Sequence, residues 1–257
     1  MLKSKPDPLW AAFQTLLSPV ILISYISAYI GVILLIIASL FTLFFLIFYY
    51  LKFRIFKKTT RNSSEKVIAF FHPYCDAGGG GERVLWCGIR SIQKRFPAEK
   101  IVIYTGDVDS APDQILEKAK KRFNIDLKLS EKLEFIYLHR RKWVEADMYP
   151  RFTLLGQSLG SIWLGLEALE KCVPDVYLDT MGYAFTLPIF KYFGNCKVGC
   201  YVHYPTISTD MLDKVRSRAK SFNNRKGIAN SALATNLKLF YYNIFAKLYS
   251  FLNWKTM

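Results

Sequence analysis

Cysteine and histidine are scarce in this sequence of 257 residues, which contains five cysteines and three histidines. No two cysteines form a CxxC pair, and no group of cysteines and histidines has the spacing of zinc ligands. The cysteines lie within apolar runs, at Cys75, Cys87, Cys172, Cys196 and Cys200. We therefore expect no metal site, and we expect buried, reduced thiols on the cytosolic side of a membrane.

Acidic residues are also few: 20 Asp and Glu stand against 35 Lys and Arg, which gives a formal net charge of +15. At the same time 52% of the residues are hydrophobic. This combination favours a membrane-bound protein whose aqueous part works beside anionic phosphates or lipid headgroups. Nucleic acid is disfavoured as a partner, because no nucleic-acid-binding motif is present and the basic residues lie beside apolar or aromatic stretches.

Charged residues are absent between Asp7 and Lys52. The most apolar part, Gly31–Leu51, has the length of about 20 residues that a membrane-spanning helix needs. Basic residues are more numerous after this stretch than before it, which predicts a lumenal amino terminus and a cytosolic main domain. We expect a lead-in at the membrane interface over residues 1–30, a transmembrane helix over 31–51 and a basic linker over 52–65. A hairpin of two spans, broken near Pro19, is the alternative.

Strand-like and helix-like segments alternate after Lys66. Apolar runs predict strands at Val67–Phe71, Ile101–Thr105 and Leu133–Leu138, and two more that end at Thr180 and Tyr204. Helical spacing predicts helices at Glu82–Phe96, Pro112–Phe123 and Phe152–Leu169, with a short one around Thr186–Phe193. Two glycines of the long helix, Gly156 and Gly160, are expected to let it pack close to a neighbour. The alternation predicts an α/β fold over residues 66–226, a Rossmann-like domain with a parallel sheet and helices on both faces.

Three polar residues follow or end predicted strands. His72 comes after the first strand, Asp179 lies near the end of the fourth, and His203 lies near the end of the fifth. Ligands of such sheets bind beyond the carboxyl ends of the strands, so these residues are expected to face one cleft. For each of them the alternative is a residue that only caps its loop.

A run of four glycines, Gly78 to Gly81, joins the first strand to the first helix. It is not a P-loop, since no Lys-Ser/Thr pair follows it, and its spacing differs from the dinucleotide fingerprint. Glycines that enter a helix expose backbone N–H groups at its positive end, and these groups suit a phosphate or a developing anion. A flexible turn is the alternative.

Five motifs together point to one known family. They read HPYCDAGGGGERVLW, YTGD, RFTLLGQSLGSIWLGLEAL, PDVYLDTMGYAFTLP and YVHYPTISTDML. They closely resemble the dolichol-linked α-1,2-mannosyltransferases of asparagine-linked glycosylation, a family of retaining, metal-independent GT-B glycosyltransferases. The resemblance runs from Val67 to Tyr249. It implies an enzyme of the endoplasmic reticulum membrane that transfers mannose on the cytosolic face, from GDP-mannose to a dolichol-diphosphate-linked oligosaccharide.

The resemblance also implies roles for individual residues. His203 is expected to be catalytic and to contact the transferred sugar. Substrate binding is expected at the glycine loop and at four other positions: Gly78, Gly79, Gly80, Gly81, Glu82, His72, Asp179 and Tyr204. No metal and no cofactor is implied, since GDP-mannose is a donor substrate. Other mannosyltransferases of the dolichol pathway are further candidate partners.

The match to the GT-B pattern is incomplete. A GT-B enzyme has a second Rossmann-like domain with a paired-glutamate motif, Glu-x7-Glu, which is absent here. We therefore expect a truncated chain that is inactive alone. The alternative is a non-catalytic, membrane-bound module that binds the lipid-linked acceptor or partner transferases.

The tail, residues 227–257, is basic, and its apolar residues recur at helical spacing. This pattern predicts an amphipathic helix on an anionic membrane surface. A helix that packs against a second domain is the alternative.

Overall fold

The computed structural model describes residues 8–60, 65–127, 129–218 and 230–256. The chain divides into two compact units, Met1–Tyr49 and Tyr50–Met257. They are described separately below.

The first unit is formed by most of helix α1, which runs over Pro8–Thr60. Among the described residues α1 is the one helix that is long and apolar enough to cross a membrane, over Ile21–Arg54. The helix continues through Pro19, so the described residues contain one helix here and no hairpin. It also continues beyond Leu51, where the sequence predicts a linker. Residues 52–60 contain no glycine or proline that would end a helix.

The second unit is built on a sheet of five parallel strands, in the order β3-β2-β1-β4-β5. The strands are β1 (Val67–Phe71), β2 (Lys100–Thr105), β3 (Leu133–Tyr137), β4 (Val176–Asp179) and β5 (Lys197–Cys200). The predicted α/β class and parallel sheet are confirmed. The last strand is shorter than predicted and ends at Cys200 instead of Tyr204. Cys200 pairs with Asp179, the last residue of β4. The Tyr201 N–H makes a last bond to the Asp179 carbonyl, and β4 offers no partner to the residues that follow.

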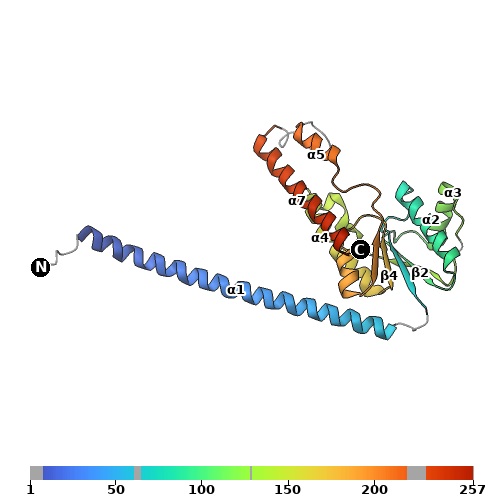
Figure 1. Ribbon diagram of the computed structural model, residues 1–257, viewed down its shortest axis with the longest axis horizontal. Coiled ribbons are helices and arrows are strands. Elements are labelled where there is room, and N and C mark those ends of the chain that lie inside the picture. The colour runs from blue at the N-terminus through green and yellow to red at the C-terminus, as the bar shows by residue number, and fades with distance from the viewer. Residues whose placement is uncertain (1–7, 61–64, 128, 219–229, 257) are drawn as a thin grey trace. The chain divides into compact units, whose positions relative to one another are not determined.

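Helices cover both faces of this sheet (Figure 1). One face carries α2 (Gly80–Arg95) and α3 (Pro112–Phe123), and the other carries α4 (Thr153–Lys171) and α7 (Ala232–Thr256). Shorter elements are η1 (Arg141–Val144), η2 (Ala146–Met148), η3 (Ile189–Phe193) and α5 (Thr209–Arg216). The short helix predicted at Thr186–Phe193 is thus only the π-type turn η3.

The alternation of side chains along β1 divides the core into two layers. Phe70 packs with Trp86 and Ile89 of α2 on one face of the sheet. Phe71 faces the opposite layer, where its ring centroid lies 5.8 Å from that of Tyr177. Phe70 is 3% exposed, and the other residues of these two layers named here are fully buried: Phe71, Trp86, Ile89 and Tyr177. The sheet is therefore covered on both sides, as a parallel sheet requires.

Close packing of α4 depends on its two glycines. A Cβ atom on Gly160 would lie 1.7 Å from the Trp143 carbonyl oxygen, and one on Gly156 would lie 2.2 Å from the Tyr149 ring. The expectation of a close neighbour at these glycines is confirmed. The neighbour is the segment of 3-10 turns η1 and η2 and not another long helix.

Candidate functional site

The strand order places a crevice at the carboxyl ends of β1 and β4. The chain proceeds from β1 outward to β2 and β3, then crosses back through α4 to β4 on the other side of β1. Such a reversal leaves the two following loops on opposite sides of a gap, where ligands of open α/β sheets bind. His72 follows β1 and Asp179 ends β4, so two predicted site residues lie at this point.

His72 connects the two sides of the reversal. Its Nδ1 atom lies 2.8 Å from the Thr180 hydroxyl oxygen, and its backbone N–H donates to the Tyr104 carbonyl. The side chain is 1% exposed, and burial lowers the pKa of the imidazole to about 4. His72 is therefore neutral near pH 7 and supplies hydrogen-bonding groups without charge.

Asp179 holds the loop that follows β4. Its Oδ1 atom accepts a 3.0 Å hydrogen bond from the Met181 N–H, just before Gly182, whose φ of +86° is left-handed. The carboxyl group is fully buried, and its Oδ2 atom has no hydrogen-bond partner among the described residues. Burial raises the pKa of Asp179 to about 7, although backbone N–H groups of the loop oppose the rise. This contact shapes the loop after β4, and the substrate-binding role that the resemblance implies for Asp179 stays a prediction.

The glycine loop is closed by the carboxylate of Glu82. The Gly78 N–H donates to both Glu82 oxygens, at 2.6 and 2.7 Å, and the Gly79 N–H donates to one of them at 3.2 Å. From the other side the Arg122 Nε–H donates to the Gly78 carbonyl at 2.6 Å. Two of the four amides that the sequence suggests for an anion are thus already paired within the chain.

The remaining glycines face the two histidines. A Cβ atom on Gly80 would lie 3.5 Å from His203 Nε2, and one on Gly81 would lie 3.9 Å from His72 Cε1. No described side chain bonds to the amides of Gly80 and Gly81. The structure therefore brings the second half of the glycine run, His72 and His203 together.

His203 is exposed, and a neighbouring phenol orients it. The Tyr201 hydroxyl lies 3.2 Å from His203 Nδ1, which leaves Nε2 directed toward Gly80. Tyr204 is 60% exposed, and no described contact joins it to the glycine loop. Of the predicted residues on this last loop, only His203 is thus brought to the glycines.

An ion pair at the end of β2 was not expected from the sequence. Arg141 of η1 pairs with Asp107, and its guanidinium carbon lies 5.0 Å from the centre of the Tyr74 ring. Gly106 makes room for it, since a Cβ atom there would lie 2.5 Å from Arg141 Cδ. Burial raises the pKa of Tyr74. Gly106 and Asp107 belong to the motif YTGD, but only the folded chain brings Arg141 to them.

Among the described residues, no group of three or more His, Cys, Asp and Glu side chains could hold a metal ion. The chemistry available at the crevice consists of the imidazoles of His72 and His203, the Thr180 hydroxyl, the carboxyl groups of Asp179 and Glu82, and backbone N–H groups.

Comparison with known proteins assigns the family. Residues 65–256 match the family described as ALG11 mannosyltransferase N-terminus. The chain belongs to the ALG11 mannosyltransferase family. The match covers the Rossmann-like domain and all of α7, so the crevice described above is the crevice of an ALG11 amino-terminal domain.

Three relatives illustrate the similarity. Each is named GDP-Man:Man(3)GlcNAc(2)-PP-Dol alpha-1,2-mannosyltransferase. The Xenopus laevis protein is 64% identical over 185 residues, which are 72% of this chain and 38% of that protein. The human protein is 58% identical over 192 residues, 74% of this chain and 39% of its own length. The Dictyostelium discoideum protein is 59% identical over 189 residues, 74% of this chain and 37% of its own length. No solved structure matches the chain.

Proposed function

We propose that this chain carries the amino-terminal part of a mannosyltransferase that adds α-1,2-linked mannose from GDP-mannose to a dolichol-diphosphate-linked oligosaccharide. The observation that carries the proposal is the family match over residues 65–256, in a domain where His203 Nε2 faces the glycine loop at the strand-order reversal. The chain spans 38% of the length of its Xenopus laevis relative.

In this proposal His203 contacts the transferred sugar. Tyr201 holds its Nδ1 atom, so the Nε2 atom is the one presented across Gly80. The amides of Gly80 and Gly81 lie at the positive end of α2, where they stabilise negative charge that develops on the leaving diphosphate. The neutral imidazole of His72 packs next to Gly81 and helps to hold this glycine in position.

The proposed location is the endoplasmic reticulum membrane. Helix α1 provides an apolar segment, Ile21–Arg54, for the span. Because basic residues are concentrated after it, the amino terminus is placed in the lumen and the catalytic domain in the cytosol.

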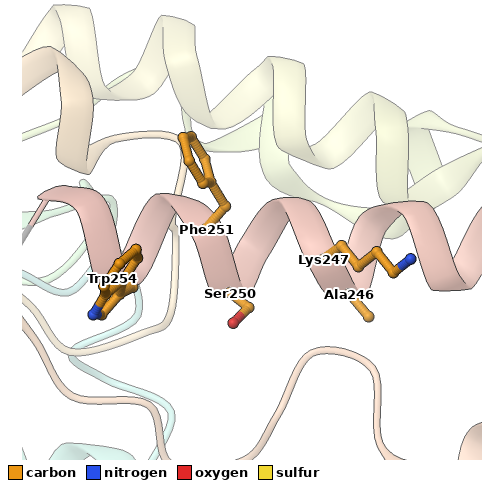
Figure 2. A pocket seen from close by; sticks show the side chains of 5 residues that line it. All are labelled: Ala246, Lys247, Ser250, Phe251 and Trp254. Carbon is orange, nitrogen blue, oxygen red and sulfur yellow. The ribbon is translucent and has the colours of Figure 1, made fainter.

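Helix α7 is proposed to rest on the membrane surface. Large apolar side chains that are 46–73% exposed recur along one side of the helix, at Leu233, Leu237, Phe240, Ile244, Phe251 and Trp254. Lys247 continues the same spacing, and α7 contains no acidic residue. Figure 2 shows Lys247, Phe251 and Trp254 along this helix, around a shallow cavity of about 470 Å³. An apolar stripe with lysines beside it fits an anionic lipid surface.

A binding module without turnover is the second candidate, and the observation that favours it is the exposed apolar stripe on α7, which is a surface for lipid or for a partner protein. Such a module would hold the lipid-linked acceptor or pair with partner transferases. Transfer of radiolabelled mannose to the lipid-linked acceptor distinguishes the two candidates.

The experiment supplements the purified chain with the remaining portion of the Xenopus laevis relative. We expect transfer in the mixture, and we expect His203→Ala to lower its rate at least about 100-fold, as loss of a group at the reacting centre does. Tyr192→Ala, at an exposed position on η3, is the control that leaves the rate unchanged. Acceptor binding without transfer in the mixture would support the module.

A further inference from the structure

The glycine loop and the carboxylate of Glu82 form a closed unit. Glu82 is the third residue of α2, from which a glutamate commonly reaches back to the N–H that precedes the helix. Here the Glu82 carboxylate accepts a hydrogen bond from that N–H, which belongs to Gly79. Both of its oxygens also accept from the Gly78 N–H. The second contact goes beyond ordinary helix capping and fills the concave set of amides that an incoming anion would use.

The carboxylate is well placed to keep this position. Glu82 is 5% exposed, so the carboxylate has little access to water with which to exchange its partners. Burial raises the pKa of the Glu82 carboxyl, and the N–H groups of Gly78, Gly79 and Ala77 counteract the rise. Arg122 fixes the opposite side of the loop through the Gly78 carbonyl.

We propose that Glu82 is a positioning residue that acts as a built-in anion: it occupies the Gly78 and Gly79 amides, excludes diphosphate from them and fixes Gly80 and Gly81 against the histidines. The inference deepens the proposed function, on which its catalytic meaning rests. In this proposal the loop is a fixed surface that faces the sugar. The Gly78 and Gly79 amides do not bind the diphosphate.

The mechanism follows from competition for the same donors. A diphosphate reaches the Gly78 and Gly79 amides only if it displaces a buried carboxylate that already makes three hydrogen bonds to them. Bonds to a charged acceptor are the strong kind, and a displaced carboxylate would remain beside the anion and repel it. Removing the charge of Glu82 therefore opens these amides to anions.

The test uses the full chain in phospholipid nanodiscs, labelled with ¹⁵N only at its 14 glycines. Inorganic diphosphate is titrated into the wild type, Glu82→Gln and the control Glu134→Gln. Glu134 lies on β3, and its carboxylate pairs with Lys100 of β2. We expect saturable shifts of the Gly78 and Gly79 amides in Glu82→Gln alone. We also expect their hydrogen exchange to accelerate about tenfold or more in that variant.

A gain of diphosphate binding is a result that general damage to the fold would not produce. Saturable shifts of Gly78 and Gly79 in the wild type would overturn the proposal, and this arm requires no variant to fold. A folded Glu82→Gln that neither binds diphosphate nor exchanges faster would overturn it as well. Neither the amide shifts nor the hydrogen exchange depends on mannose transfer. The proposal for Glu82 can therefore fail while the proposed function stands.

Discussion

At the scale of single residues, the crevice depends on backbone conformations that only some residues adopt. Gly78 has a φ of +81°, and its carbonyl receives the Arg122 Nε–H. Gly79, the next residue, has an ordinary φ of −87° and open space at its Cβ position. The two glycines therefore offer a matched pair for measuring how much the loop conformation contributes to stability.

Gly78→Ala should lower the free energy of unfolding by about 1–2 kcal/mol, the cost of a left-handed conformation for a residue with a Cβ atom. That Cβ would also lie 2.8 Å from Arg122 Nε and would displace the guanidinium. Gly79→Ala should cost about 0.5 kcal/mol, because alanine is only a poorer residue before a helix. Denaturant unfolding of both variants measures the difference, and equal costs would contradict a strained loop.

The roles of these residues could be predicted only in part from the sequence. The glycine run and His72 were expected in one crevice with His203 because the first two follow a predicted strand and His203 lies near the end of another. The role of Glu82 could not be predicted in this form, because its reach to Gly78 depends on the left-handed turn at that glycine. Arg122 and Arg141 come from segments distant in sequence, and only the tertiary fold places them.

At the scale of secondary structure, hydrophobic periodicity predicted most of the elements. The bounds of β1 and α3 agree with the prediction to the residue, since turn residues or proline mark their ends. The predicted end of β5 was wrong, because apolar residues continue past Cys200 while the neighbouring strand does not. Local sequence carries no information about the length of a partner strand.

The exposed stripe on α7 supports a prediction about this helix alone. A peptide spanning Ser231–Trp254 should bind anionic liposomes, since the apolar side chains enter the lipid boundary while the lysines meet the headgroups. The control peptide carries serine in place of Leu237, Phe240 and Ile244, and its partition coefficient should be at least about tenfold lower. Sedimentation with liposomes at moderate salt measures both. Failure of the unaltered peptide to bind would favour a protein partner for this face.

At the scale of the whole molecule, two buried groups give stability opposite dependences on pH. The pKa of Asp179 is about 7 in the folded protein against an ordinary value of 3.8, so its contribution to stability is present at low pH and is lost as pH rises through 7. The pKa of His72 is about 4 against an ordinary 6.5, so its contribution is present above 6.5 and is lost as pH falls through 4.

Between these pKa values the two slopes have opposite signs, each about 1.4 kcal/mol per pH unit, and largely offset one another. Asp179→Asn removes the falling slope. Its free energy of unfolding should therefore rise with pH between about 4 and 6.5, whereas that of the wild type stays nearly level. Denaturant titrations at several pH values measure this, with Asp126→Asn as the exposed control. Parallel profiles for Asp179→Asn and the wild type would refute the assignment.

The close packing at Gly156 and Gly160 has a consequence for the ion pair between Arg141 and Asp107. Because these glycines have no side chain, the Trp143 carbonyl and the Tyr149 ring pack directly against the backbone of α4. Trp143 and Arg141 share the turn η1, and Arg141 reaches from there to Asp107 at the mouth of the crevice. A methyl group added at Gly160 would therefore push η1 away from α4. The shift would move Arg141 and disturb its ion pair with Asp107. The packing of α4 against η1 therefore also positions the ion pair between Arg141 and Asp107.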